Sequence, residues 1–220
     1  AALKVRAGYV RLTKANGGEV IDDADRQIEA MDSTRELIAS WDDLPAAFPY
    51  SSKFIQIEGF KTIKRELFLN VGLAVLAVAV IIFVTIGSLM ATVLVTANVA
   101  MCIVEILGFM HALGIVIDSV SVINMVLAVG LSVDYSAHIG HCFVAKRGGD
   151  KKTRATEALA DMGQAVLSGA ISTFLAVVVL LFSKSYVFRV LSTQFALTVG
   201  LGIAHGLLLL PVMLSVLGPG

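Results

Sequence analysis

The sequence has few charged residues and very few cysteines. Only 15% of its 220 residues are charged whereas 57% are hydrophobic, and the mean hydropathy of +0.85 is far above what a soluble domain needs. Cys102 and Cys142 lie in apolar stretches, which indicates buried thiols and not a disulfide framework. The sequence has no nucleophile elbow, phosphate-binding loop or zinc-ligand spacing. These absences argue against an enzyme and predict an integral membrane protein without cofactor or metal.

Charge is unevenly distributed along the chain. Residues 1–66 hold 21 of the 34 charged side chains, which predicts a polar domain over 1–66 before a membrane domain over 67–220. In the polar part, "LKVRAGYVRL" predicts a short β segment, a turn follows at 16–18, and "DDADRQIEAMDSTRELIASW" has the apolar spacing of a helix. The alternation in "KFIQIEGF" predicts one more strand, so we expect a partial α+β domain. The chain lacks an initiator Met and a signal-peptide core, and we expect it to be a fragment of a longer protein.

Five apolar segments follow, each long enough to cross a hydrocarbon core of about 30 Å. We predict spans at 67–87, 89–113, 118–143, 163–183 and 189–217. The connecting loop 144–162 concentrates five basic residues within 146–154, so the positive-inside rule predicts that it is cytoplasmic. Counting spans from this loop places the C-terminus in the cytosol and the polar domain in the lumen or outside the cell. A smaller basic cluster at 61–65 opposes this orientation, and the denser loop is given more weight.

The third span carries ionisable residues in "AVGLSVDYSAHIGHCF". At about 100° per residue, Gly130, Asp134, His138 and His141 share one helix face. A carboxylate at this depth costs a few kcal/mol, so we expect the stripe to face a protein interior or a water-filled cavity. A proton or cation relay is the functional interpretation, and a neutral hydrogen-bonded pair that only fixes helix packing is the alternative. A metal site is not expected, because no further ligand cluster accompanies these residues.

Other polar residues lie inside the predicted spans. Glu105 in "MCIVEILGF" is a second candidate for the relay, and a packed, protonated carboxylic acid is an equally open interpretation. His205 lies between Gly202 and Gly206, where small residues allow helices to approach closely, which favours a hydrogen-bonded helix contact. Asn124 is expected to bond across helices near the relay.

These residues resemble a known family. "GLSVDYSAHI" is similar to the Gly-x-x-x-acid motif, with His four residues later, in the tenth transmembrane helix of the Niemann-Pick type C1 and Patched group of the resistance-nodulation-division superfamily. Three other stretches resemble that group in the same order: "EALADMGQAVLSGAIST", "FSKSYVFRV" and "HGLLLLPVMLSVLGP". The resemblance implies the end of the second extracytoplasmic domain followed by helices eight to twelve, with the first half of the protein absent.

The resemblance also implies a function. It suggests a sterol or lipid transporter coupled to a proton or cation gradient, in an endosomal, lysosomal or plasma membrane. Gly130, Asp134 and His138 match the motif, whereas His141 lies outside it, and the family often has Glu where this chain has Asp134. The expected partners are a sterol or other lipid, the bilayer and the missing N-terminal half, with no nucleic acid. A Patched-like receptor or sterol-responsive signalling protein is the alternative, and a structural scaffold is a third.

Overall fold

The computed structural model describes residues 13–16, 19–22, 24–41, 48–115, 117–146 and 148–219. The chain divides into two compact units, Ala1–Lys64 and Arg65–Gly220. The first unit contains an antiparallel hairpin, β1 (Thr13–Asn16) and β2 (Glu19–Asp22), in which Asn16 lies opposite Glu19. Residues 17 and 18 of the turn predicted at 16–18 lie outside the described residues. The β segment predicted over 3–12 lies outside the described residues.

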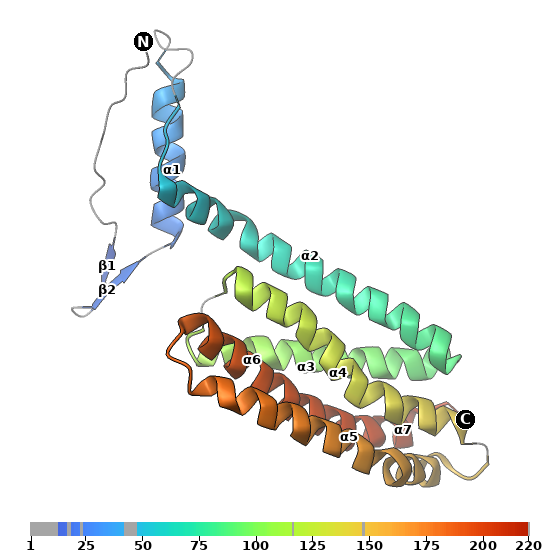
Figure 1. Cartoon of the computed structure of the whole chain (residues 1–220). Coiled ribbons are helices and arrows are strands. Elements are labelled where there is room, and N and C mark those ends of the chain that lie inside the picture. The colour runs from blue at the N-terminus through green and yellow to red at the C-terminus, as the bar shows by residue number, and fades with distance from the viewer. Residues whose placement is uncertain are drawn as a thin grey trace. The chain divides into compact units, whose positions relative to one another are not determined.

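Two helices pack together in the first unit. They are α1 (Ala24–Ala39) and the beginning of α2 (Ser52–Ile86), which continues into the second unit (Figure 1). Met31 of α1 packs with Phe54 and Ile57 of α2. Lys61 also forms an ion pair with Asp32 of α1, at 2.8 Å from Nζ to Oδ2. One residue of the basic cluster that opposes the predicted orientation is therefore paired with an acid within the first unit.

The strand predicted at "KFIQIEGF" is wrong, because α2 is already helical there. Phe54 and Ile57 are buried at helical spacing, whereas Ile55 is 73% exposed. The apolar residues of this stretch fit both periods, and packing against α1 selects the helical one.

The prediction of five membrane-spanning helices is confirmed by five helices that are long and apolar enough to cross a bilayer. The first is the part of α2 from Arg65 to Ile86. The next three are α3 (Leu89–Ala112), α4 (Ser119–Ala145) and α5 (Lys151–Leu181). The last consists of α6 (Tyr186–Ile203), a π-helical segment η1 (Ala204–Leu209) and α7 (Leu210–Leu217). Among the described residues the chain is therefore a multi-pass helical membrane domain preceded by a hairpin and a helix.

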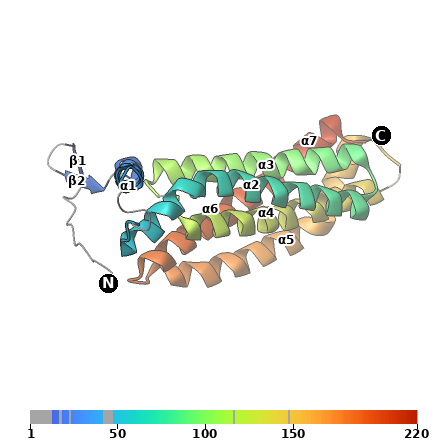
Figure 2. The same cartoon turned by 90° about the horizontal axis from the view of Figure 1, so that it is seen from above.

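The helix α5 is longer than the fourth predicted span. It starts at Lys151, so the part of the loop after that residue is helical and continuous with the span. Its first turns point in a different direction from the remainder, as both views show (Figures 1 and 2).

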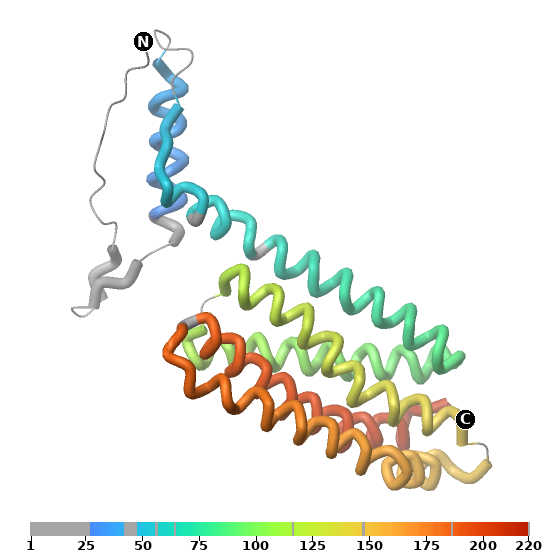
Figure 3. Tube along the Cα trace, viewed as in Figure 1, coloured from blue at the N-terminus to red at the C-terminus, as the bar shows by residue number. Residues whose placement is uncertain are grey.

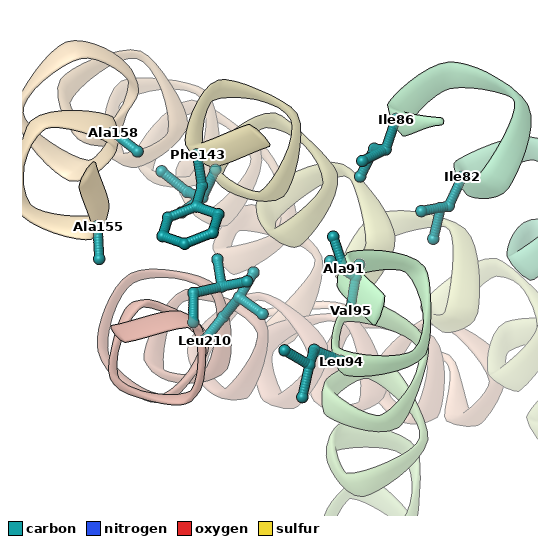
Figure 4. Packing of buried hydrophobic residues seen from close by; sticks show 11 residues of the cluster. Ile82, Ile86, Ala91, Leu94, Val95, Phe143, Ala155, Ala158 and Leu210 are labelled. Atoms are coloured by element: carbon teal, nitrogen blue, oxygen red, sulfur yellow. The ribbon is translucent and has the colours of Figure 1, made fainter. Parts of the chain in front are cut away.

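In the second unit, α4 packs against α3, α5 and α6 and is the central helix of this bundle (Figure 3). At one end of the bundle, Phe143 and Leu210 belong to a buried cluster that also contains Ile86 and Ala91 (Figure 4). The cluster joins the α2–α3 turn, the end of α4, the start of α5 and the last span. These are the segments that counting of spans places on one side of the membrane.

The side chain of Arg154 stabilises the same end of the bundle. It is buried, and its guanidinium donates to the carbonyl of Phe143 at 3.1 Å and to that of Pro219 at 3.0 Å. The guanidinium carbon also lies 4.4 Å from the centre of the Phe143 ring, a cation–π distance. Asp150 caps the N-terminus of α5, and hydrogen bonds from Thr153 lower the pKa of its carboxyl. One arginine thus connects α5 to the ends of α4 and α7.

Candidate functional site

The ionisable stripe on α4 lies on an exposed face of this chain. Gly130, Asp134, His138 and His141 are all exposed, whereas Ser136 on the opposite side of the helix is fully buried. Within the described residues no hydrogen bond or ion pair joins the three ionisable side chains to one another. The described helices therefore do not enclose the stripe, for which we expected a protein interior or a water-filled cavity.

Asp134 and His138 line a cleft between α4 and α5. The cleft has a volume of about 300 Å³ and includes Tyr135 and, on α5, Val166 and Thr173. The Tyr135 hydroxyl is buried and has no hydrogen-bond partner of good geometry in the described part of the chain. Thr173 donates its own hydroxyl hydrogen to the carbonyl of Gly169 at 2.9 Å. The cleft thus combines apolar walls with a carboxylate, an imidazole and two hydroxyls, while His141 lies outside it.

Glu105 is not part of this stripe. It lies on α3, where its Oε2 is 3.0 Å from Nε2 of His205. The His205 side chain is only 7% exposed, whereas that of Glu105 is 44% exposed. The second ring nitrogen of His205, Nδ1, lies 3.2 Å from the backbone carbonyl of Asn98. The structure therefore joins a residue predicted for the relay with one predicted for helix packing.

His205 lies in the π-helical segment η1, which interrupts the last span. The N–H of Leu210 bonds to the carbonyl of His205, five residues earlier, as in a π-helix. Pro211 follows directly, and a proline lacks an N–H and crowds the carbonyl four residues before it. A wider turn just before the proline relieves that conflict, and such π segments are frequent at functional sites.

The glycines beside His205 allow this span to lie directly against α4. A Cβ atom added at Gly206 would lie 2.9 Å from the backbone oxygen of Tyr135, and one added at Gly202 would lie 2.6 Å from its ring. Both distances are too short for real carbon atoms. The absence of side chains at these two positions therefore permits the contact between the last span and Tyr135.

Polar side chains also connect the helices inside the bundle. Asn124 of α4 donates to Oε1 of Gln194 on α6 at 2.7 Å. Asn98 of α3 donates to the hydroxyl of Ser136 on α4 at 3.0 Å, and the thiol of Cys102 lies 3.5 Å from the Ser132 hydroxyl. Hydrocarbon offers these polar groups no hydrogen-bond partners, and the contacts between helices supply them.

Asn98, Gln194 and Arg154 were not selected from the sequence as site residues, whereas Glu105 was. Asn98, Cys102 and Glu105 follow one another at four and three residues along α3, the same helical spacing that reveals the stripe on α4. That spacing could have identified them as one polar face. Gln194 and Arg154 carried no comparable signal, because Gln194 bonds to Asn124, 70 positions away, and Arg154 bonds to Pro219, 65 positions away. No group of three or more potential metal ligands occurs among the residues that the structure describes.

The fold and these buried polar contacts define a multi-pass integral membrane protein with ionisable groups inside its spans. The sequence model of the family described as "Protein export membrane protein SecD/SecF, C-terminal" matches residues 45–217. The chain belongs to this family, and its relatives make it a Niemann-Pick C1-like protein of the resistance-nodulation-division type.

Three relatives illustrate this similarity. The chain is 37% identical over 175 residues to NPC intracellular cholesterol transporter 1 of Sus scrofa. The matched region covers 78% of the chain and 14% of that protein. The chain is 34% identical to NPC intracellular cholesterol transporter 1 homolog 1b of Drosophila melanogaster, with the same coverage. It is 31% identical to NPC1-like intracellular cholesterol transporter 1 of Rattus norvegicus, with 78% of the chain and 13% of that protein covered. The chain thus spans about one seventh of the length of these relatives.

Proposed function

We propose that this chain is part of a transporter of sterols or other lipids. The relatives that it resembles are named as cholesterol transporters. We further propose that Asp134 and His138 couple this transport to a proton or cation gradient, with His141 next along the same face. The observation that carries the proposal is the cleft of about 300 Å³, in which a carboxylate and an imidazole lie on a face that the chain's own helices leave open.

The chemistry of the cleft supports a relay. A carboxylate in a bilayer is stable only where water, a cation or a proton compensates its charge. His138 lies one helical turn from Asp134, and an imidazole changes protonation near physiological pH. With one proton bound, the pair has zero net charge, and when it releases that proton the remaining carboxylate charge is balanced by water or a cation. We also infer that the basic loop between α4 and α5 faces the cytosol, as the positive-inside rule predicts.

Transport by the whole protein in liposomes tests this proposal. We expect sterol transfer between membranes to increase when a pH gradient is applied, and Asp134→Asn to remove that increase while protein insertion is unchanged. Asp161→Asn is the matched control, because this carboxylate is 53% exposed and pairs with Lys146 at the end of the bundle. An undiminished gradient effect in Asp134→Asn would reject the relay. No sterol or lipid transfer by the wild-type protein would reject the transporter and favour a Patched-like receptor.

A further inference from the structure

The two ring nitrogens of His205 have different partners, and this difference determines where protons lie. Nδ1 faces the backbone carbonyl of Asn98 at 3.2 Å. A carbonyl oxygen only accepts hydrogen bonds, so Nδ1 carries a hydrogen in both the neutral and the charged imidazole. The second nitrogen, Nε2, faces the carboxyl of Glu105 at 3.0 Å. The protonation of the pair is therefore decided at the contact between Nε2 and Oε2.

This contact needs one proton. If Nε2 and the carboxyl were both deprotonated, a nitrogen lone pair would face a negatively charged oxygen at hydrogen-bond distance, and the two would repel each other. With one proton, either a charged imidazole donates to a carboxylate or a carboxylic acid donates to a neutral imidazole. Both arrangements satisfy the contact, and both have zero net charge. We propose that Glu105 and His205 form a second proton-binding site, separate from the stripe on α4, in which the two side chains share one proton.

Burial supports the shared proton. His205 is buried where η1 packs against α3 and α4, and an isolated imidazolium would be unfavourable there. Glu105 is less buried, so it can exchange a proton with the surroundings of this chain. The neutral, proton-loaded pair is therefore the form that fits the observed geometry, and loss of the proton is expected to separate the two side chains.

Among the described residues, Glu105 is the charged side chain that contacts His205. From α3, the thiol of Cys102 lies one turn before Glu105 and contacts Ser132. From α4, the titratable side chain of Tyr135 packs against the glycines beside His205. The α7 helix has no ionisable side chain, and Arg189 of α6 lies near the other end of that helix. Glu105 is thus the acidic partner of His205.

The position of His205 links this site to the α4 stripe. The ring belongs to η1, and the next residue, Gly206, lies directly against the backbone of Tyr135. Tyr135 follows Asp134 in sequence and lines the same cleft. A proton on the Glu105–His205 pair therefore stabilises the position of η1 against the residue next to Asp134.

Proton uptake by the whole protein in nanodiscs tests the inference. A pH-indicator dye measures protons bound per molecule when the pH falls from about 8 to about 5.5, the range in which histidine changes charge. Glu105→Gln keeps the side-chain size and can still donate to Nε2. We expect this variant and His205→Gln each to bind one proton fewer than the wild type. The double variant should also bind one fewer, because both substitutions remove the same proton.

Two outcomes would overturn the inference. Wild-type uptake by Glu105→Gln would mean that the pair binds no proton in this range. A loss of two protons in the double variant would mean that the residues titrate independently. Asp134→Asn is the control for the α4 stripe and should leave the effect of Glu105→Gln unchanged. Thermal unfolding of each variant checks folding, and if His205→Gln does not fold, Glu105→Gln alone decides the result. The measurement does not depend on lipid transfer, so it is independent of the proposed transport function.

Discussion

The contact between Gly206 and Tyr135 leads to a prediction that can be worked out from distances. An added methyl at Gly206 would lie 2.9 Å from the backbone oxygen and 3.0 Å from the backbone carbonyl carbon of Tyr135. Ordinary carbon contacts begin near 3.4 Å, so the last span and α4 would have to separate by several tenths of an ångström. Overpacking of this kind costs about 1–3 kcal/mol. We therefore expect Gly206→Ala to lower the free energy of unfolding by about that amount.

Gly200 provides the matched control. It lies on the same span, in α6, and an added Cβ there would meet no atom within 4 Å. Alanine favours a helix over glycine by about 1 kcal/mol, so Gly200→Ala should be neutral or stabilising. Thermal unfolding of the whole protein, followed by the reaction of buried thiols such as Cys102 with a dye, measures the difference. Equal stability of the two variants would refute the assignment of Gly206 to a close helix contact.

Two further predictions concern other contacts of the bundle. Arg154→Ala should destabilise the protein by about 2–4 kcal/mol, because it removes the two hydrogen bonds that this buried guanidinium donates. Lys152→Ala, at an exposed position, should change stability by less than about 0.5 kcal/mol. Equal effects of these two substitutions, measured by thermal unfolding, would contradict the role of the arginine. Asn124→Ala and Gln194→Ala, combined in a double-mutant cycle, should show a coupling energy of about 0.6–1.7 kcal/mol. Strictly additive effects would mean that their hydrogen bond contributes nothing to stability.

Much of the membrane domain could be predicted because long apolar segments are easily recognised in the sequence. Each span is a long apolar segment, and a bilayer accepts only segments whose backbone groups are satisfied internally. The polar part was harder to predict. The stretch around Phe54 and Ile57 has an apolar pattern that fits a strand as well as a helix, and the long-range contact with Met31 decides between them. Likewise, hydropathy does not show that the helix of the fourth span continues without a break back to Lys151.

The candidate site could be predicted only as far as single helices allow. Helix phase placed Asp134, His138 and His141 on one face, because that relation depends only on residue spacing. The pairing of Glu105 with His205 joins residues 100 positions apart, and nothing in either local sequence specifies the partner. Pro211 is the local cause of the π-helical turn that contains His205. A proline within a long apolar segment indicates a disturbed turn but does not say which residue that turn directs toward a neighbour.

The central helix α4 separates two polar systems that differ in what compensates their charge. On its exposed face, Asp134 has no partner among the described residues, so its charge must be balanced by water, an ion or residues outside this chain. On its buried side, the pair formed by Glu105 and His205 is neutral as long as it holds one proton. Tyr135 belongs to both systems, since it lines the cleft of Asp134 and contacts the glycine that follows His205. Because no side chain lies between Gly206 and Tyr135 to absorb a displacement, movement of the π-helical turn is transmitted directly to the backbone next to Asp134.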